Sequence, residues 1–153
     1  MKLYTIAVSH YCEKARWALQ LNGQRFEEIP SLPIFHRAVV KSIGGGSTVP
    51  VLVSEDKVYA ESAEILRQFG TGQVNLYSSD TQLNAQVIEL EDYFDNHLGP
   101  ASRRMAYYAV LPKKSVTMRL LAPKAPPFQY FLIRTFYPIV KVVMAKAMNI
   151  NAA

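Results

Sequence analysis

One stretch near the N-terminus, Val8 to Leu19, places a hydroxyl and a thiol at the point where an apolar strand turns into a helix. Leu3 to Val8 is an apolar run of strand length, and Ser9 is a favourable helix N-cap. Residues that favour helix follow from Cys12 until Asn22-Gly23 ends the pattern. A helix N-terminus stabilises an anion such as a thiolate, because it exposes unpaired N–H groups and a partial positive charge. The stretch therefore predicts a site that handles sulfur.

Two further motifs follow in the first half of the chain. Thr48-Val49-Pro50-Val51 puts a proline at the start of a second apolar strand, where a missing N–H is tolerated. Glu61-Ser62 opens another helix with an acid and a hydroxyl. In this order and spacing, Ser-x-x-Cys, Thr-Val-Pro-Val and Glu-Ser resemble the N-terminal domain of the glutathione S-transferase family. The resemblance covers residues 1–75 and implies a thioredoxin-like fold.

The expected elements agree with that fold class. Residues 1–75 give the order strand, helix, strand, helix, strand, strand, helix, which a thioredoxin-like sheet requires. After a linker, the rest of the chain reads as helical. We therefore expect an α/β thioredoxin-like, glutathione-binding domain over 1–75, followed by an all-α, shortened C-terminal domain over 79–153.

The helical region is unusually short and apolar. We expect a first helix with one apolar stripe that Gly99-Pro100 ends, residues 101–111 resuming the helix after a kink, and a last helix over residues 128–148 that bends at Pro138. The last helix is apolar on nearly every face, so we expect a second copy of the chain to cover it in a homodimer, with a membrane surface as the less favoured alternative. The stripe consists of Leu83, Val87, Leu90, Phe94 and Leu98.

Composition and charge exclude several classes of protein. The 153 residues hold a single cysteine, so no internal disulfide can form, and no signal peptide is visible at the N-terminus; both favour a cytoplasmic protein. No His, Cys or acidic residues have the spacing of metal ligands, and Gly44-Gly45-Gly46 lacks the lysine of a phosphate-binding loop. From Asn96 onward there are nine Lys or Arg residues and no acid. Because no cluster of five forms, we interpret them as a solvated helical face, and expect no nucleic-acid partner.

The resemblance assigns a catalytic role to Ser9, which would face the sulfur of glutathione as co-substrate. A hydroxyl hydrogen bond favours the thiolate over the thiol and so lowers the thiol pKa. Tyr11 and Cys12 are candidates for auxiliary roles, and either Ser9 or Cys12 could face the sulfur. Cys12 matches the second cysteine of glutaredoxin-type C-x-x-C motifs, but a buried hydrophobic role is the alternative. We expect His10 at the surface.

The remaining glutathione-binding residues also come from the resemblance. Val49-Pro50 would hold a cis peptide bond that presents the Val49 backbone to the cysteinyl part of glutathione. Glu61 and Ser62 would bind the γ-glutamyl end, the acid pairing with its ammonium group. Lys41 would pair with the glycyl carboxylate, with Arg37 and His36 as competitors.

These expectations point to an enzyme of detoxification that conjugates the glutathione thiolate to an electrophilic, apolar co-substrate. The co-substrate pocket is expected between the first domain and the helix over 83–111, with contributions from Met105, Tyr107 and Tyr108. One alternative is a glutathione-dependent redox protein that works through Cys12. Another is a non-catalytic binding or scaffold module.

Overall fold

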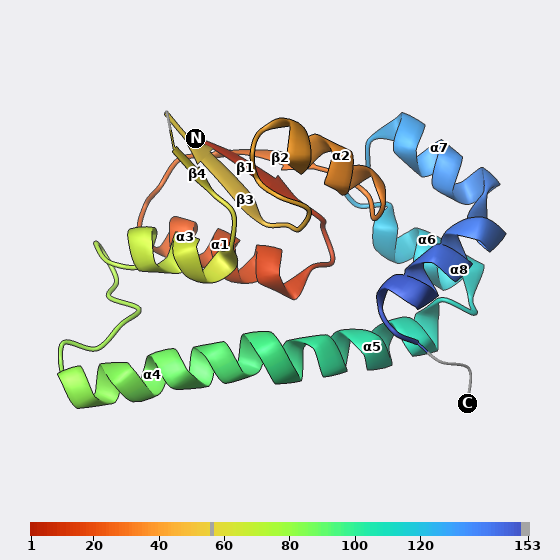
Figure 1. Ribbon diagram of the computed structural model, residues 1–153. Coiled ribbons are helices and arrows are strands. Elements are labelled where there is room, and N and C mark those ends of the chain that lie inside the picture. Colours follow the sequence, from red (N-terminus) through yellow and green to blue (C-terminus); the bar gives the residue numbers. More distant parts are fainter. Residues whose placement is uncertain (56, 151–153) are drawn as a thin grey trace.

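The computed structural model describes residues 1–55 and 57–150, and its first half contains one mixed four-stranded sheet (Figure 1). The spatial order is β2-β1-β3-β4; β1 pairs parallel with β2 and antiparallel with β3, which pairs antiparallel with β4. A parallel pair needs a crossover connection, and the first helix supplies it. The strands are β1 (Lys2–Thr5), β2 (Glu27–Pro30), β3 (Val51–Ser54) and β4 (Lys57–Tyr59).

Helices cover both faces of this sheet. On one face, α1 (His10–Leu21) and α3 (Ser62–Phe69) lie side by side, and α2 (Phe35–Ser42) lies on the other (Figure 1). This arrangement confirms the predicted thioredoxin-like fold. A first core fills the space between the sheet and the helix pair, and it consists of Leu3, Ala15, Leu19, Leu52, Tyr59 and Ile65.

The first strand is shorter than the sequence suggested. It ends at Thr5, because the chain then turns into α1, with the Ser9 N–H donating to the Ile6 carbonyl oxygen at 3.0 Å. The other end of α1 agrees with the prediction: Asn22 is the C-cap, and Gly23 has a φ of +65°, which favours glycine.

A long composite helix follows the sheet and its three helices in the chain and runs beneath α1 and α3 (Figure 1). It comprises α4 (Thr81–Tyr93), the π-helical turn η1 (Phe94–Leu98) and α5 (Gly99–Val110). Gly99-Pro100 does not end the helix as predicted, whereas the predicted helical continuation over residues 101–111 is present as α5. The Gly99 N–H donates to the Phe94 carbonyl oxygen, so the turn before the proline widens and the helix continues past it.

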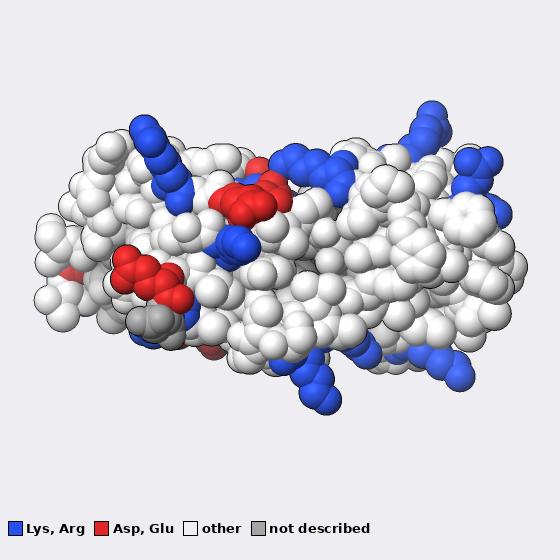
Figure 2. Space-filling model, turned by 90° about the horizontal axis from the view of Figure 1, so that it is seen from above, with Lys and Arg blue, Asp and Glu red and all other residues white. Residues whose placement is uncertain are grey.

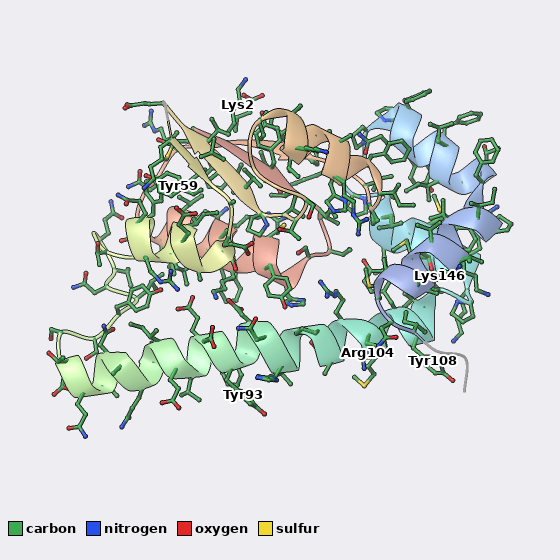
Figure 3. All side chains as sticks on the ribbon, viewed as in Figure 1. Lys2, Tyr59, Tyr93, Arg104, Tyr108 and Lys146 are labelled. Atoms are coloured by element: carbon green, nitrogen blue, oxygen red, sulfur yellow. The ribbon has the colours of Figure 1, made fainter. Side chains whose placement is uncertain are left out.

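The orientation of the long helix also differs from the apolar-stripe prediction. Leu83, Leu90, Phe94 and Leu98 are each about half exposed. Tyr93 and Tyr108 likewise project away from the sheet (Figure 3). The side that faces α1 is polar instead and presents Glu91 and Asp95 to Lys14.

The last helical segment is two helices rather than one bent helix. The break falls at Phe136, just before Pro138, whose ring is tolerated in the first turn of a new helix. One side of this segment is buried within its own chain, in a second core made of Leu32, Leu111, Met118, Leu121, Ile133, Tyr137, Val140 and Met144. The helices concerned are α6 (Lys114–Leu121), α7 (Pro127–Thr135) and α8 (Tyr137–Ala147).

Tyr137 is a polar anchor of this second core. Its hydroxyl donates to the Leu111 carbonyl oxygen at 2.8 Å and lies 2.9 Å from Thr117 Oγ1. Tyr137→Phe should lower the free energy of unfolding by about 1–2 kcal/mol, because a buried acceptor loses its donor. Urea denaturation measures the change, with Tyr108→Phe as the control, since Tyr108 is 57% exposed. Equal effects of the two substitutions would contradict the structure of this core.

Candidate functional site

A cavity of about 340 Å³ lies where the N-terminus of α1, the segments around Ile34 and Thr48, α5 and α8 meet. Its volume is within the range of small-molecule sites. The first half of the chain contributes Ile6, Val8, Ser9, His10, Tyr11, Pro33, Ile34, His36, Arg37, Ser47, Thr48 and Val49. The helical region contributes Arg103, Tyr107, Val143, Met144, Ala147 and Met148.

Ser9 lines this cavity at the N-terminus of α1. Its extended backbone makes it the N-cap, and its Oγ accepts a hydrogen bond from the Cys12 N–H at 3.4 Å. A hydroxyl that accepts a hydrogen bond keeps its own hydrogen free to donate. The Ser9 hydroxyl can therefore cap the helix and donate to a ligand at the same time.

Cys12 lies behind Ser9 and outside the cavity. The thiol is fully buried, and its Sγ accepts a hydrogen bond from the Ile6 N–H at 3.5 Å. Burial raises the pKa of Cys12, although the hydrogen bonds from Ser9 and Ile6 oppose this. A buried thiol with a raised pKa is a poor nucleophile.

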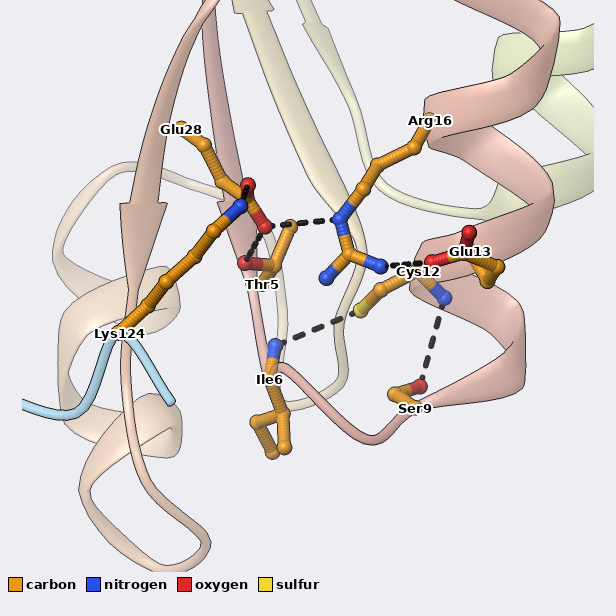
Figure 4. A network of polar contacts seen from close by, with 8 residues as sticks. All are labelled: Thr5, Ile6, Ser9, Cys12, Glu13, Arg16, Glu28 and Lys124. Carbon is orange, nitrogen blue, oxygen red and sulfur yellow. Dashed lines mark hydrogen bonds and ion pairs between the residues drawn. The ribbon is translucent and has the colours of Figure 1, made fainter. Parts of the chain in front are cut away.

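Close to Cys12, the carboxylate of Glu28 on β2 joins three parts of the chain (Figure 4). It accepts hydrogen bonds from Thr5 Oγ1 at 2.7 Å, Arg16 Nε at 2.8 Å and Lys124 Nζ at 2.5 Å. Burial by itself would raise the pKa of Glu28, but the hydrogen bonds from Lys124, Thr5 and Arg16 outweigh it and lower the pKa to about 2. The carboxylate therefore stays charged and ties the segment before α7 to the sheet.

The polar part of the cavity wall is cationic or neutral. Arg37 and Arg103 line it together with His10 and His36, and no Asp or Glu does. Burial and then the charge of Arg103 lower the pKa of His10, and burial and then Arg37 lower the pKa of His36. Two guanidinium groups beside neutral imidazoles attract an anionic ligand.

Tyr11 connects the cavity to the long helix. Its hydroxyl donates to the Asp95 carbonyl oxygen at 2.7 Å, and the Arg103 guanidinium lies 5.9 Å from the centre of its ring. Gly99 permits this approach, because a Cβ there would stand 2.5 Å from Tyr11 Oη and 3.0 Å from His10 Nε2. The hydroxyl of Tyr11 is thus already committed to the protein.

The structure brings only part of the predicted glutathione site to the cavity. The Val49–Pro50 bond is cis as expected, and Val49 lines the cavity with the buried Pro50 behind it. Glu61 and Ser62 sit at the start of α3 as predicted, but outside the cavity lining; Glu61 is the exposed N-cap and Ser62 is buried.

Other predicted site residues do not line the cavity. Lys41 is exposed in the last turn of α2 and does not reach the cavity, whereas its competitor Arg37, one turn earlier, does. Of the residues expected in the co-substrate pocket only Tyr107 lines it; Met105 and Tyr108 are 72% and 57% exposed. Met105 lies two positions and Tyr108 one position from Tyr107, so both side chains point to other sides of the helix.

Sequence reasoning did not find the contribution of α8. Val143, Met144 and Met148 form an apolar wall, but their residue types are also those of an ordinary core. His10, expected at the surface, is exposed and lines the cavity as well. No signal in the sequence indicates that α8 lies opposite Ser9, because the two are more than a hundred positions apart.

Within residues 1–55 and 57–150, no three His, Cys, Asp or Glu side chains lie close enough to hold a metal ion. In the same ranges, every helix is too short or too polar to cross a membrane.

The sheet, the cis-proline segment and the Ser9 helix N-terminus define a thioredoxin-like domain with a helical region attached. Residues 3–71 match the family model for the glutathione S-transferase N-terminal domain. With the fold, this match shows that residues 3–71 form a domain of the glutathione S-transferase N-terminal type. Comparison with curated proteins gives no match.

Several solved structures have the same fold as this chain. The chain is similar to a "possible" glutathione S-transferase from Rhodopseudomonas palustris, with a TM-score of 0.58 and 20% identity over 72% of this chain and 57% of that chain. A glutathione S-transferase from Xanthobacter autotrophicus Py2 is similar with a TM-score of 0.57 and 23% identity, over 80% of this chain and 62% of that chain. A glutathione transferase homolog from Burkholderia GL BGR1 with bound glutathione is similar with a TM-score of 0.54 and 14% identity, over 98% of each chain. The chain thus covers about three-fifths of the first two structures.

The electrostatics of the cavity can be tested through His10. Arg103→Gln should raise the pKa of His10, because the imidazolium form no longer meets a neighbouring guanidinium. An NMR titration of the histidine side chains measures this change. Arg104→Gln removes the same charge from an exposed position that does not line the cavity, and should leave His10 unchanged. A His10 pKa that is the same in wild type and Arg103→Gln would contradict the arrangement.

Proposed function

We propose that the chain binds glutathione in this cavity and transfers its thiolate to an electrophile with an apolar body. The observation that carries the proposal is Ser9, whose hydroxyl lines the cavity at a helix N-terminus within a glutathione S-transferase N-terminal domain. The structural neighbour from Burkholderia with bound glutathione supports the ligand. Residues 1–75 would be the glutathione-binding domain and 79–153 the helical domain.

In the proposed mechanism the protein activates a bound nucleophile. The Ser9 hydroxyl donates to the sulfur of glutathione, and the positive end of α1 favours its negative charge; both stabilise the thiolate over the thiol. The thiolate electron pair forms a bond to the electrophilic carbon, and a leaving group departs with the pair of the broken bond. Ser9 itself forms no covalent bond.

The charge of the cavity suits the carboxylates of glutathione. Arg37 is the residue we propose for the glycyl carboxylate in place of Lys41, because it lines the cavity and a guanidinium can bind a carboxylate through two parallel hydrogen bonds. Roles for Val49, Pro50, Glu61 and Ser62 stay predictions that rest on the family resemblance.

The second substrate would lie against the helical side. Val8, Tyr107, Val143, Met144 and Met148 offer an apolar wall, which suits an electrophile with an apolar body. The wall closes the cavity from α5 and α8, so the chain has a pocket of its own. This favours an enzyme over a scaffold module that lacks a pocket.

The redox alternative has less support. It requires a thiol that can meet glutathione, and Cys12 is fully buried outside the cavity with a raised pKa. A thiolate is needed for disulfide exchange, and this environment disfavours one.

A cytoplasmic location and a homodimer also stay predictions. The exposed stripe of Leu83, Leu90, Phe94 and Leu98 on α4 and η1 is an apolar surface that a second copy can bury. This surface lies on a different element from the last helix, through which the sequence suggested dimer formation.

Ser9 and Cys12 separate the transferase from the redox protein. Ser9→Ala should lower the rate of conjugation of a chlorodinitrobenzene to glutathione by about ten- to a thousandfold, the range for loss of one donor to a developing charge. Ser9→Thr keeps the hydroxyl and is the conservative control; thermal unfolding checks the lost helix cap, which costs about 1 kcal/mol. Cys12→Ala should leave conjugation nearly intact. Loss of activity in Cys12→Ala with full activity in Ser9→Ala would overturn the proposal.

Arg37 and Lys41 form a matched pair on one helix. Arg37→Gln should weaken glutathione binding by about ten- to a hundredfold, as expected for a hydrogen-bonded charge pair. Lys41→Gln removes the same charge one turn away from the cavity and should have little effect. Calorimetry gives both affinities, and a larger effect at Lys41 would restore the original assignment.

A further inference from the structure

One surface of the helical region is apolar and unpartnered. Five apolar side chains on α7, on α8 and at Phe136 between these helices are at least half exposed. Together with the exposed cations Arg134 and Lys146 they are called the α7–α8 patch. The exposed fractions are 70% for Phe128, 62% for Phe131, 52% for Phe136, 63% for Ile139 and 53% for Val142.

The helical spacing places these residues opposite the core. Tyr137, Val140 and Met144 bury one side of α8, while Ile139, Val142 and Lys146 are three and four positions apart on the other side. On α7, Ile133 is buried and Phe128 and Phe131 lie one turn apart on the opposite side. The exposed face is therefore a second apolar face of helices whose core side is already satisfied.

The charge around this face has one sign. The chain from Asn96 onward holds nine Lys or Arg residues and no acid. Seen from above, the end of the molecule that carries α7 and α8 shows Lys and Arg side chains but no Asp or Glu, and the acidic side chains gather over the other part (Figure 2). Apolar side chains within a wholly basic surrounding are typical of a surface that binds anionic lipid.

Charge also argues against self-association through this face. In a two-fold dimer the same patch meets itself, so Arg134 and Lys146 would approach cations of the second copy, and residues 96–153 hold no Asp or Glu side chain to offset the repulsion. A bilayer with anionic headgroups supplies the opposite charge, and its interface accepts Phe and Ile side chains.

We propose that the α7–α8 patch binds the surface of an anionic membrane, with its Phe and Ile side chains in the headgroup region and its cations at the phosphates. The site does not depend on glutathione binding, and the cavity lies on the inner side of α8. The chain would then be held at a lipid surface where apolar electrophiles concentrate.

Vesicle sedimentation tests this proposal on the whole chain. Wild-type protein should bind vesicles of phosphatidylglycerol and phosphatidylcholine, bind vesicles of phosphatidylcholine alone much more weakly, and be released by high salt. The double variant Arg134→Glu/Lys146→Glu should lower the partition coefficient by about tenfold or more. Arg25→Glu/Arg67→Glu changes the net charge of +5 by the same four units at exposed positions outside the patch, and should bind nearly as wild type.

A second pair tests the apolar part. Phe131→Ser/Ile139→Ser should also lower binding, whereas Met105→Ser/Tyr108→Ser, at positions that are 72% and 57% exposed on the long helix, should not. Circular dichroism confirms that each variant is folded. Absence of vesicle binding by the wild type, equal loss in patch and control variants, or a dimer that only the patch variants dissociate would overturn the proposal; the last outcome would assign the face to a second copy.

Discussion

The contact between Lys14 on α1 and two carboxylates of the long helix determines how the two halves of the molecule meet. Lys14 Nζ lies 2.7 Å from Glu91 Oε1 and 2.6 Å from Asp95 Oδ2, and all three side chains are largely shielded from water. Three positions before Lys14 on α1, the Tyr11 hydroxyl donates to the backbone carbonyl oxygen of the same Asp95. These contacts fix the rotation of the long helix, and the rotation decides that Arg103 and Tyr107, rather than Met105 and Tyr108, face the cavity.

The stability of each half and the geometry between the halves have different origins. Burying a Leu or Ile side chain contributes about 1.5–3 kcal/mol, and each half has its own apolar core. Two contacts between the halves are polar, namely the Lys14 contacts on one side of α1 and the Glu28 cluster with Lys124 on the other, while Leu32 of the first half packs into the second apolar core. Because hydrogen bonds demand direction and apolar contacts do not, the polar contacts orient the two halves around the cavity.

The two faces of α8 serve different proposed partners. The inner face buries Val140 in the second core and lends Met144 and Met148 to the cavity, and the outer face carries Ile139 and Val142. With these two faces, the last segment carries apolar residues on nearly every side. A protein that conjugates apolar electrophiles would meet them at the lipid surface that the outer face is proposed to bind.

The sequence by itself determined the local structure: the Ser9 cap, the end of α1 at Asn22, the start of α3 and the thioredoxin-like order of elements, because caps, turns and period-two strands depend on near neighbours. Only the tertiary structure decided which residues share the cavity. Arg37 lines the cavity and Lys41 does not, α8 forms part of its wall, and the long helix continues past Gly99-Pro100 with its Leu stripe exposed. These outcomes follow from contacts between residues far apart in the chain, such as Lys14 with Asp95 and Glu28 with Lys124, and local periodicity carries no information about such pairs.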